Sequence, residues 1–134
     1  MRTVKYKCGY SYITVGVHHY QTKILPEKDI ITPMVSLTAT GLLSIASNYG
    51  WNGASGVPDR RWSMTASLIH DALTQLVRIG ELDRKWIPHV HMELRDTLID
   101  NEAPGVFVRM FYWARRFMAG SLRPSAEPVV YSAP

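Results

Sequence analysis

Short runs of apolar and β-branched residues, separated by polar ones, fill the first third of the chain and predict β-strands. The first expected strand is Tyr10–Val15, and the second is Tyr20–Leu25. Two further runs, Val35–Thr40 and Leu42–Ala46, lie on either side of Gly41, which predicts a hairpin or a bulge at that glycine. The N-terminal part is therefore expected to form a small antiparallel sheet.

A helical period begins after a stretch that glycines and Pro58 interrupt. Asp59 or Ser63 is placed to cap a first helix, which should run to about Ile79 and end at Gly80. Apolar residues recur along it at spacings of four, three, four and three, which predicts one buried face. This stripe consists of Trp62, Ala66, Ile69, Leu73 and Leu76.

Two more helices are predicted, each with a proline near its start. Pro88 fits the first turn of one helix, and Pro104 opens the other, which should end at Gly120. The inward face of the earlier helix is expected to contain Ile87, His91, Leu94 and Leu98. The apolar stripe of the later helix is expected to contain Val106, Phe107, Met110, Phe111, Ala114, Phe117 and Met118.

The order of these elements predicts an α+β fold. A small antiparallel β-sheet should be followed by three α-helices that pack on it, with a glycine-rich loop leading into the first helix. A chain of 134 residues fits a single domain, which we place at residues 1–122. Residues 123–134 contain three prolines and no apolar stripe, so they are expected to form an extended C-terminal arm.

Composition narrows the class of protein without indicating an activity. Hydrophobic residues make up 46% of the chain and charged residues 19%, as in ordinary globular proteins. The net charge of +4 is compatible with phosphate partners but does not require them. Cys8 is the one cysteine, which favours a reducing compartment or a particle assembled in the cytosol. Neither a signal peptide nor a transmembrane helix is predicted.

Spacing on the first helix places His70 and Asp71 in different surroundings. The neighbours of His70 at i−4 and i+3 are Ala66 and Leu73, so its imidazole should lie on or beside the buried stripe. Asp71 has polar neighbours and should be more accessible. His91 lies on the inward face of the next helix, so the two histidines should meet if the helices pack antiparallel. A hydrogen-bonded core histidine and a catalytic imidazole are both open interpretations.

Loop 48–58 joins the predicted sheet to the first helix and carries Gly50, Gly53 and Gly56 at three-residue spacing. Such glycines let a backbone turn so that its carbonyls face one point. Calcium takes carbonyl and carboxylate oxygens as ligands. One interpretation is therefore a hard-cation site beside Asp71, with calcium as the candidate cofactor. The other is a tight connection between sheet and helix.

Two segments carry a resemblance to a known family. Tyr49–Gly56 has the sequence Y-G-W-N-G-A-S-G, and Ala66–Leu76 has the sequence A-S-L-I-H-D-A-L-T-Q-L. They resemble a family of short phage and prophage proteins of uncharacterised function, in which a W-D-G-A-S-G-P loop precedes an A-S-L-V-H-D-A-L helix. The similarity extends over roughly residues 35–118. It implies a phage-encoded accessory or virion-associated structural protein, found in the host cytoplasm and in the phage virion.

The order Y-G-x-x-G-x-x-G-x-P followed by H-D is also similar, at a distance, to calcium-loop phospholipases. In those enzymes loop carbonyls and the aspartate after the histidine hold calcium, while the histidine activates water. A carboxylate on the antiparallel helix orients the histidine. The resemblance implies His70 as the base and Asp71 as a calcium ligand, with carbonyls from Gly50, Asn52 and Gly53. The alternative function is therefore a calcium-dependent hydrolase of a phospholipid or a similar ester.

Two positions depart from these patterns. The phage family usually has aspartate where this chain has Asn52, so one candidate anionic ligand is neutral. The family also tends to place an aspartate on the second helix, where this chain has His91. A neutral histidine accepts a hydrogen bond from His70, but it does not offset the charge of an imidazolium. The leading interpretation is a structural protein whose phospholipase-like site, including the His70 and His91 pair, is degenerate.

The third helix carries Arg109, Tyr112, Trp113 and Arg116 opposite its apolar stripe. Arginine and aromatic residues on a helix surface are common at protein interfaces, whereas a solvated face and a lipid or nucleic-acid face are the alternatives. No firm nucleic-acid or membrane signal accompanies them. We expect partners among other phage virion proteins or copies of this chain, held in part by the apolar cluster of the arm. That cluster consists of Val129, Val130 and Tyr131.

Overall fold

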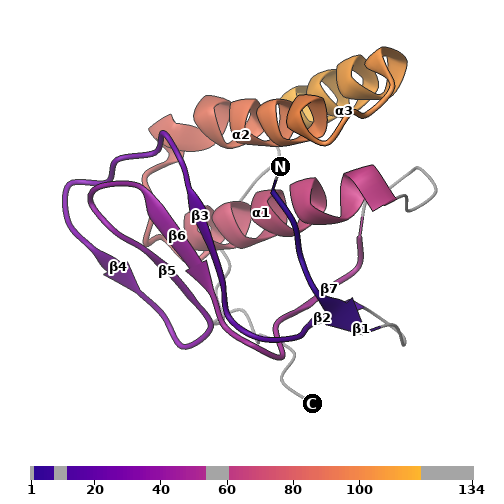
Figure 1. The fold of residues 1–134 in the computed structure, drawn as a ribbon. Coiled ribbons are helices and arrows are strands. Elements are labelled where there is room, and N and C mark those ends of the chain that lie inside the picture. The colour runs from indigo at the N-terminus through magenta and orange to yellow at the C-terminus, as the bar shows by residue number, and fades with distance from the viewer. Residues whose placement is uncertain (1, 8–11, 54–60, 119–134) are drawn as a thin grey trace.

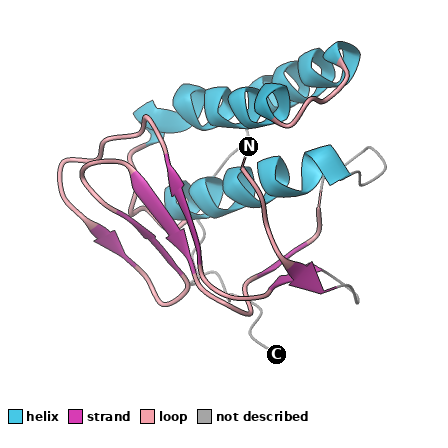
Figure 2. Ribbon diagram, in the orientation of Figure 1, coloured by secondary structure: helices cyan, strands magenta, loops and turns pink. Residues whose placement is uncertain are grey.

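The computed structural model of the chain describes residues 2–7, 12–53 and 61–118. The fold is α+β, as predicted, with the strands preceding the helices (Figure 1, Figure 2). The strands are β1 (Tyr6–Lys7), β2 (Tyr12–Thr14), β3 (His18–Gln21), β4 (Ile30–Ile31), β5 (Val35–Leu37), β6 (Leu42–Ile45) and β7 (Gly50–Trp51). The helices are α1 (Arg61–Arg78), the short 3-10 helix η1 (Arg84–Trp86), α2 (Ile87–Asp100) and α3 (Gly105–Met118).

The strands form two small antiparallel sheets, where a single sheet was expected. The strand order is β1-β2-β7 in one sheet and β3-β6-β5-β4 in the other. The hairpin predicted at Gly41 joins β5 to β6, with Leu37 opposite Leu43. Gly41 has a φ of +90°, and a Cβ atom there would lie 2.5 Å from the carbonyl oxygen of Thr22. This turn therefore requires a glycine.

Two of the predicted strand and loop boundaries are wrong. The strand expected at Tyr20–Leu25 instead covers His18–Gln21, because those four residues pair with β6. Residues 48–58 were expected to form a loop, but Gly50–Trp51 forms β7 against Tyr12–Ile13. Strands of two residues, such as β1, β4 and β7, are too short to produce an alternating pattern. Their positions are set by the strands with which they pair.

The C-terminus of α1 lies where the sequence places it. Gly80 has a φ of +80°, and the N–H of the residue after it donates to the carbonyl of Leu76 at 3.0 Å. This is the left-handed glycine ending that the pattern predicts. Ser63 is not the N-cap of the helix, because it lies inside α1 and is buried there. The other expected cap, Asp59, lies outside the described residues.

Helix α1 is the centre of the fold. Fourteen of its eighteen residues are buried, and it lies between the strands on one side and α2 on the other (Figure 1). The main core joins both sheets to α1 and to the first turns of α2. Its fully buried leucines include Leu37, Leu43, Leu68, Leu73 and Leu76.

The described side chains of α3 pack beside α1 and α2 and not on the sheets, which corrects the expected packing of all three helices on one sheet. Val108 is buried and Phe107 is half-buried in this second core. The predicted stripe is wrong at Val106 and Met110, which are 62% and 43% exposed. They lie on the side of α3 turned away from the other helices. The buried members of the second core are Ala66, Leu94, Leu98 and Val108.

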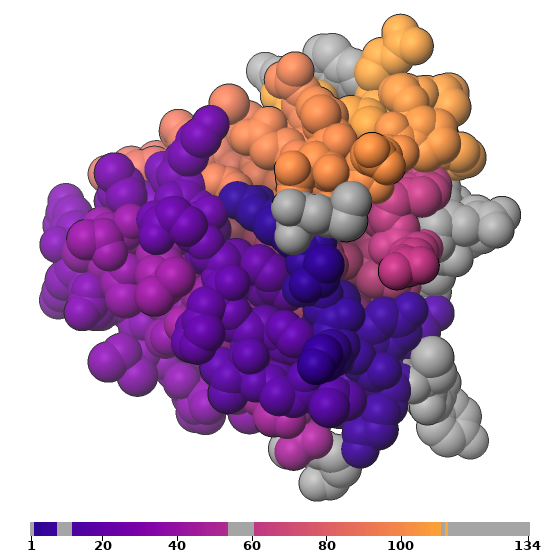
Figure 3. Space-filling view, viewed as in Figure 1, coloured from indigo at the N-terminus to yellow at the C-terminus, as the bar shows by residue number. Residues whose placement is uncertain are grey.

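Residues 2–5 lie along the edge strand β3, and we call them the N-terminal strap. The hydroxyl of Tyr20 donates to the carbonyl of Thr3 at 2.6 Å, and the N–H of Lys5 donates to Nε2 of His18 at 3.4 Å. In the space-filling view the indigo strap crosses the molecule between the strands and α2 (Figure 3). An open strand edge invites pairing with other chains, so the strap shields the edge of β3.

Candidate functional site

His70 and His91 face each other across the interface of α1 and α2, as their spacing predicted. Nε2 of His70 lies 3.3 Å from Nδ1 of His91, and the rings are 22° from parallel with centroids 5.3 Å apart. Both side chains are buried, with exposed fractions of 5% and 3%. When both rings are neutral, one donates and the other accepts a single hydrogen bond. The pair thus joins two imidazoles where the phospholipase pattern joins an imidazole to a carboxylate.

Asp71 is the more accessible neighbour of His70, as predicted. Its side chain is 33% exposed, against 6% for the histidine. Oδ1 of Asp71 lies 3.8 Å from Nδ1 of His70, and Oγ1 of Thr74 lies 3.5 Å from the same nitrogen. The two ring nitrogens of His70 therefore face different elements, one α1 and the other α2. A line of polar groups runs from a partly exposed carboxylate to the buried His91.

The loop residues assigned to calcium lie at or just after β7. Gly50 is part of the strand, Asn52 is exposed, and Gly53 is buried with a φ of +75°. Residues 54–60 lie outside the described part of the chain. Within that part, no three His, Cys, Asp or Glu side chains gather in a way that would hold a metal ion. A site made from backbone carbonyls and Asp71 stays a prediction from the resemblance.

Two aromatic residues of the loop motif attach it to α1. The indole N–H of Trp51 donates to Oγ of Ser67 at 3.0 Å, and the hydroxyl of Tyr49 donates to Oε1 of Gln75 at 2.6 Å. All four side chains are buried. These residues belong to the same two segments that carry the family resemblance, but the sequence analysis did not pair them. The available signal was the presence of polar Ser67 and Gln75 beside an apolar stripe.

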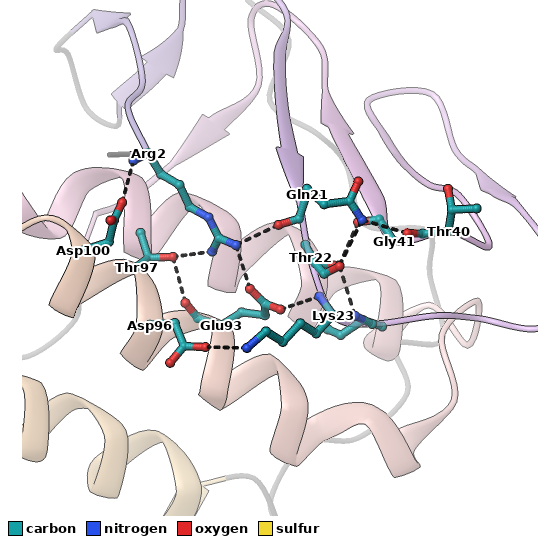
Figure 4. Close-up of polar contacts among 11 residues, drawn as sticks. Arg2, Gln21, Thr22, Lys23, Thr40, Gly41, Glu93, Asp96, Thr97 and Asp100 are labelled. Atoms are coloured by element: carbon teal, nitrogen blue, oxygen red, sulfur yellow. Dashed lines mark hydrogen bonds and ion pairs between the residues drawn. The ribbon is translucent and has the colours of Figure 1, made fainter.

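A second buried polar cluster, which the sequence analysis missed, centres on Glu93 of α2 (Figure 4). Its carboxylate is 3% exposed, lies 3.0 Å from Nη2 of Arg2 and accepts the N–H of Lys23 at 2.6 Å. Arg2 also donates to Oγ1 of Thr97 at 2.6 Å and to the carbonyl of Gln21 at 2.8 Å. These bonds fasten the strap and the end of β3 to α2. The sequence analysis could not explain a buried Glu93, because its charge partner, Arg2, is distant in the sequence.

The residues predicted for partner binding lie on α3 or beyond it. Arg109 is exposed, and Tyr112 is half-buried with the guanidinium of Arg95 5.9 Å from its ring centre. Trp113 and Arg116 belong to α3, but their side chains lie outside the described part of the chain. Their role in binding stays a prediction. The arm residues Val129, Val130 and Tyr131 also lie outside the described part.

No protein family model, curated protein or solved structure matches this chain. The resemblances to phage proteins and to calcium-loop phospholipases therefore rest on the loop and helix segments of the sequence. In the described part of the chain, none of the helices combines the length and the apolar character that crossing a membrane requires.

Proposed function

We propose that this chain is a phage-encoded accessory or virion-associated structural protein, made in the host cytoplasm and carried in the virion. The resemblance of its loop and first helix to short phage proteins is the basis of the proposal. In this role the protein binds other virion proteins or copies of itself. Its phospholipase-like loop serves as a structural connection between the strands and α1, the helix that carries His70 and Asp71.

The observation that supports this proposal best is the group that faces His70. A histidine that activates water is helped by a carboxylate that stabilises the imidazolium formed. On α2, His91 lies within hydrogen-bonding distance of His70, at 3.3 Å, at the place where the phospholipase pattern has a carboxylate. A neutral imidazole at this position supplies no compensating charge on the α2 side, whereas the carboxylate of Asp71 lies 3.8 Å from the other ring nitrogen. With an exposed fraction of 5%, His70 also presents little surface to a substrate.

The loop contacts support the same proposal. Calcium loops direct several carbonyl oxygens toward the ion, whereas Gly50 lies in β7 opposite Ile13. Trp51 and Tyr49 instead donate hydrogen bonds to α1. The acceptors are the hydroxyl of Ser67 and the side-chain carbonyl of Gln75. These hydrogen bonds give the residues of the motif a structural role that does not involve catalysis.

Incorporation into particles tests the structural role. Phage particles are produced with the full-length chain or with a chain truncated after residue 122, purified, and assayed for this protein by mass spectrometry. We expect the full-length chain in the particles and its loss after truncation, because the arm is the predicted anchor. An unchanged melting temperature of the truncated chain would separate lost binding from lost folding. Absence of the full-length chain from particles and from their assembly intermediates would contradict the proposal.

A second candidate function, calcium-dependent ester hydrolysis, is favoured by one observation. Asp71 presents a partly exposed carboxylate 3.8 Å from Nδ1 of His70. Calcium calorimetry and ester release from phospholipid vesicles would be measured on wild type, His70→Ala and Asn52→Asp. A hydrolase would lose ester release in His70→Ala and bind calcium more tightly in Asn52→Asp, because more anionic ligands raise calcium affinity. If none of the three binds calcium or releases ester, this second function is excluded.

A further inference from the structure

Asn52 and Gly53 form an asparagine–glycine pair directly after β7, and it is the one such pair in the sequence. Asn52 is exposed and lies outside the strand, and Gly53 has a φ of +75°. An asparagine side chain reaches the backbone nitrogen of the residue that follows it. A glycine in that place has no Cβ atom to hinder the approach. The pair therefore combines an accessible side-chain amide with an unhindered backbone nitrogen.

Asn48 is also exposed, but its surroundings differ at the next residue. That residue is Tyr49, which is buried and carries a large side chain. The N–H of Tyr49 donates to Oγ1 of Thr14 at 2.9 Å. The backbone nitrogen beside Asn48 is therefore held in a hydrogen bond and points away from the asparagine side chain.

Asn101 differs from Asn52 in both of its reacting groups. It is half-buried, and its side-chain amide donates to the carbonyl of Arg2 at 2.9 Å. The N–H of the next residue, Glu102, donates to the carbonyl of Ile99 at 3.0 Å. Of the three asparagines in the chain, Asn52 is thus the one that joins an exposed amide to a following glycine.

We propose that Asn52 is a self-modification site, at which the folded protein converts the side-chain amide into a carboxylate without an enzyme. The backbone nitrogen of Gly53 loses its proton and attacks the side-chain carbonyl carbon of Asn52. A C–N bond forms, the bond to the amide nitrogen breaks, and that nitrogen leaves with the proton as ammonia. The product is a succinimide ring. Because the ring closes within one chain, no other molecule has to reach the buried Gly53 for the bond to form.

Water then opens the ring by breaking one of its two C–N bonds. Attack at the side-chain carbon gives aspartate, and attack at the main-chain carbonyl carbon gives isoaspartate, in which the main chain is longer by one atom. Both products place a negative charge at an exposed position. Isoaspartate also lengthens the backbone between Trp51 and Gly53, which are both buried. It should therefore lower the melting temperature, whereas aspartate should leave it unchanged.

This modification does not depend on the proposed function, but it changes the loop that the second candidate function uses. The aspartate product is the same chain as the Asn52→Asp variant. Aged protein therefore contains molecules with the additional anionic group that raises calcium affinity. A loop that binds no calcium leaves the modification intact, because its readout is a covalent change.

Peptide mapping by mass spectrometry tests the proposal on the purified full-length chain, kept folded at neutral pH over several weeks. Chromatography separates the aspartate and isoaspartate products. We expect conversion at Asn52 to be about ten-fold faster or more than at Asn48 and Asn101, which are controls within the same molecule. Mildly alkaline buffer should speed it further, because the attacking nitrogen must lose its proton. Equal rates at the three asparagines, or an unconverted Asn52, would overturn the proposal.

Two variants test the mechanism. Gly53→Ala should slow the conversion by about ten-fold or more, because the added Cβ atom hinders the attack. Alanine is strained at a φ of +75°, so circular dichroism must show that this variant is folded. Asn52→Gln avoids that strain and should remove most of the ammonia release, because glutamine has to close a larger ring. Ammonia release as fast as that of wild type, in either folded variant, would contradict the proposed reaction.

Discussion

Arg2 and Glu93 form an ion pair of 3.0 Å, although 91 positions separate them in the chain. The glutamate side chain is 3% exposed and the arginine side chain 24%. A carboxylate this deeply buried depends on its charge partner and on its hydrogen bonds. The N-terminal strap is therefore anchored on α2 by a buried carboxylate and contributes to the stability of the fold.

Arg2→Ala should lower the free energy of unfolding by about 3 kcal/mol, because it leaves a buried carboxylate without its cation. Urea denaturation measures the change. Lys23→Ala is the matched control, since its Nζ lies 4.0 Å from Asp96 and its side chain is 82% exposed. A surface pair of this kind contributes less than about 1 kcal/mol. Equal losses in the two variants would show that the Arg2–Glu93 pair is no stronger than a surface pair.

Gly41→Ala should destabilise the protein by more than about 2 kcal/mol. The new Cβ atom would lie 2.5 Å from the carbonyl oxygen of Thr22, at a residue whose φ is +90°. Gly16→Ala separates the two causes, because Gly16 has a φ of +80° with no atom within 4 Å of the added carbon. It should lose only about 1 kcal/mol, from backbone strain alone. If thermal unfolding finds the same loss at both sites, the hairpin has relaxed to accept the methyl group.

Ser67→Ala should lower the free energy of unfolding by about 1–2 kcal/mol, because it removes the acceptor of a buried indole N–H. The donor is Trp51, at 3.0 Å. Near-UV circular dichroism should also change, since the indole loses a fixed contact. Ser44→Ala serves as the control, because its hydroxyl contacts the exposed His19. A Ser67 variant as stable as this control would mean that the hydrogen bond from Trp51 to Ser67 adds nothing to the stability of the fold.

Tyr20 should make the protein lose stability at high pH. Burial raises the pKa of its phenol, and the Arg2 guanidinium offsets part of that rise. The unfolded chain ionises the phenol near its ordinary pKa of about 10. The contribution of the neutral phenol to stability is therefore complete below that pH and is lost as the pH rises above it.

Tyr20→Phe isolates this effect from the other tyrosines. The variant should lose about 1 kcal/mol at neutral pH, because the hydroxyl no longer donates to the carbonyl of Thr3. Between about pH 10 and pH 12 its stability should fall less steeply than that of wild type. Urea titrations at about pH 8 and about pH 11 measure both quantities. Parallel losses in the two proteins would show that Tyr20 ionises in the folded state as easily as in the unfolded one.

The sequence predicted α1 and the meeting of His70 with His91 because several local signals agree there. A helical period, a terminal Gly80 and a proline in the first turn of α2 together fix the two helices and their faces. Once the faces are known, the histidines follow from spacing. The loop motif was also identified, although its attachment through Trp51 was not.

What the sequence did not predict depends on contacts between distant parts of the chain. The short strand β7 exists because β2 offers it a partner, and Glu93 is buried because Arg2 reaches it. Helical spacing alone does not tell which apolar side of α3 faces the core, so Val106 and Met110 were assigned to the wrong side. Periodicity identifies apolar faces, but tertiary packing decides which of them is covered.

The N-terminal strap leaves the ribosome well before its partners on α2, which come 91 and 95 positions later in the chain. Bringing together ends so far apart requires that a long loop close first, which slows folding. During synthesis the strap therefore lacks its anchor on α2, and covers β3 less firmly, until α2 has emerged. For that interval the nascent protein is exposed to strand pairing with neighbouring chains, and the docking of Arg2 on Glu93 ends it.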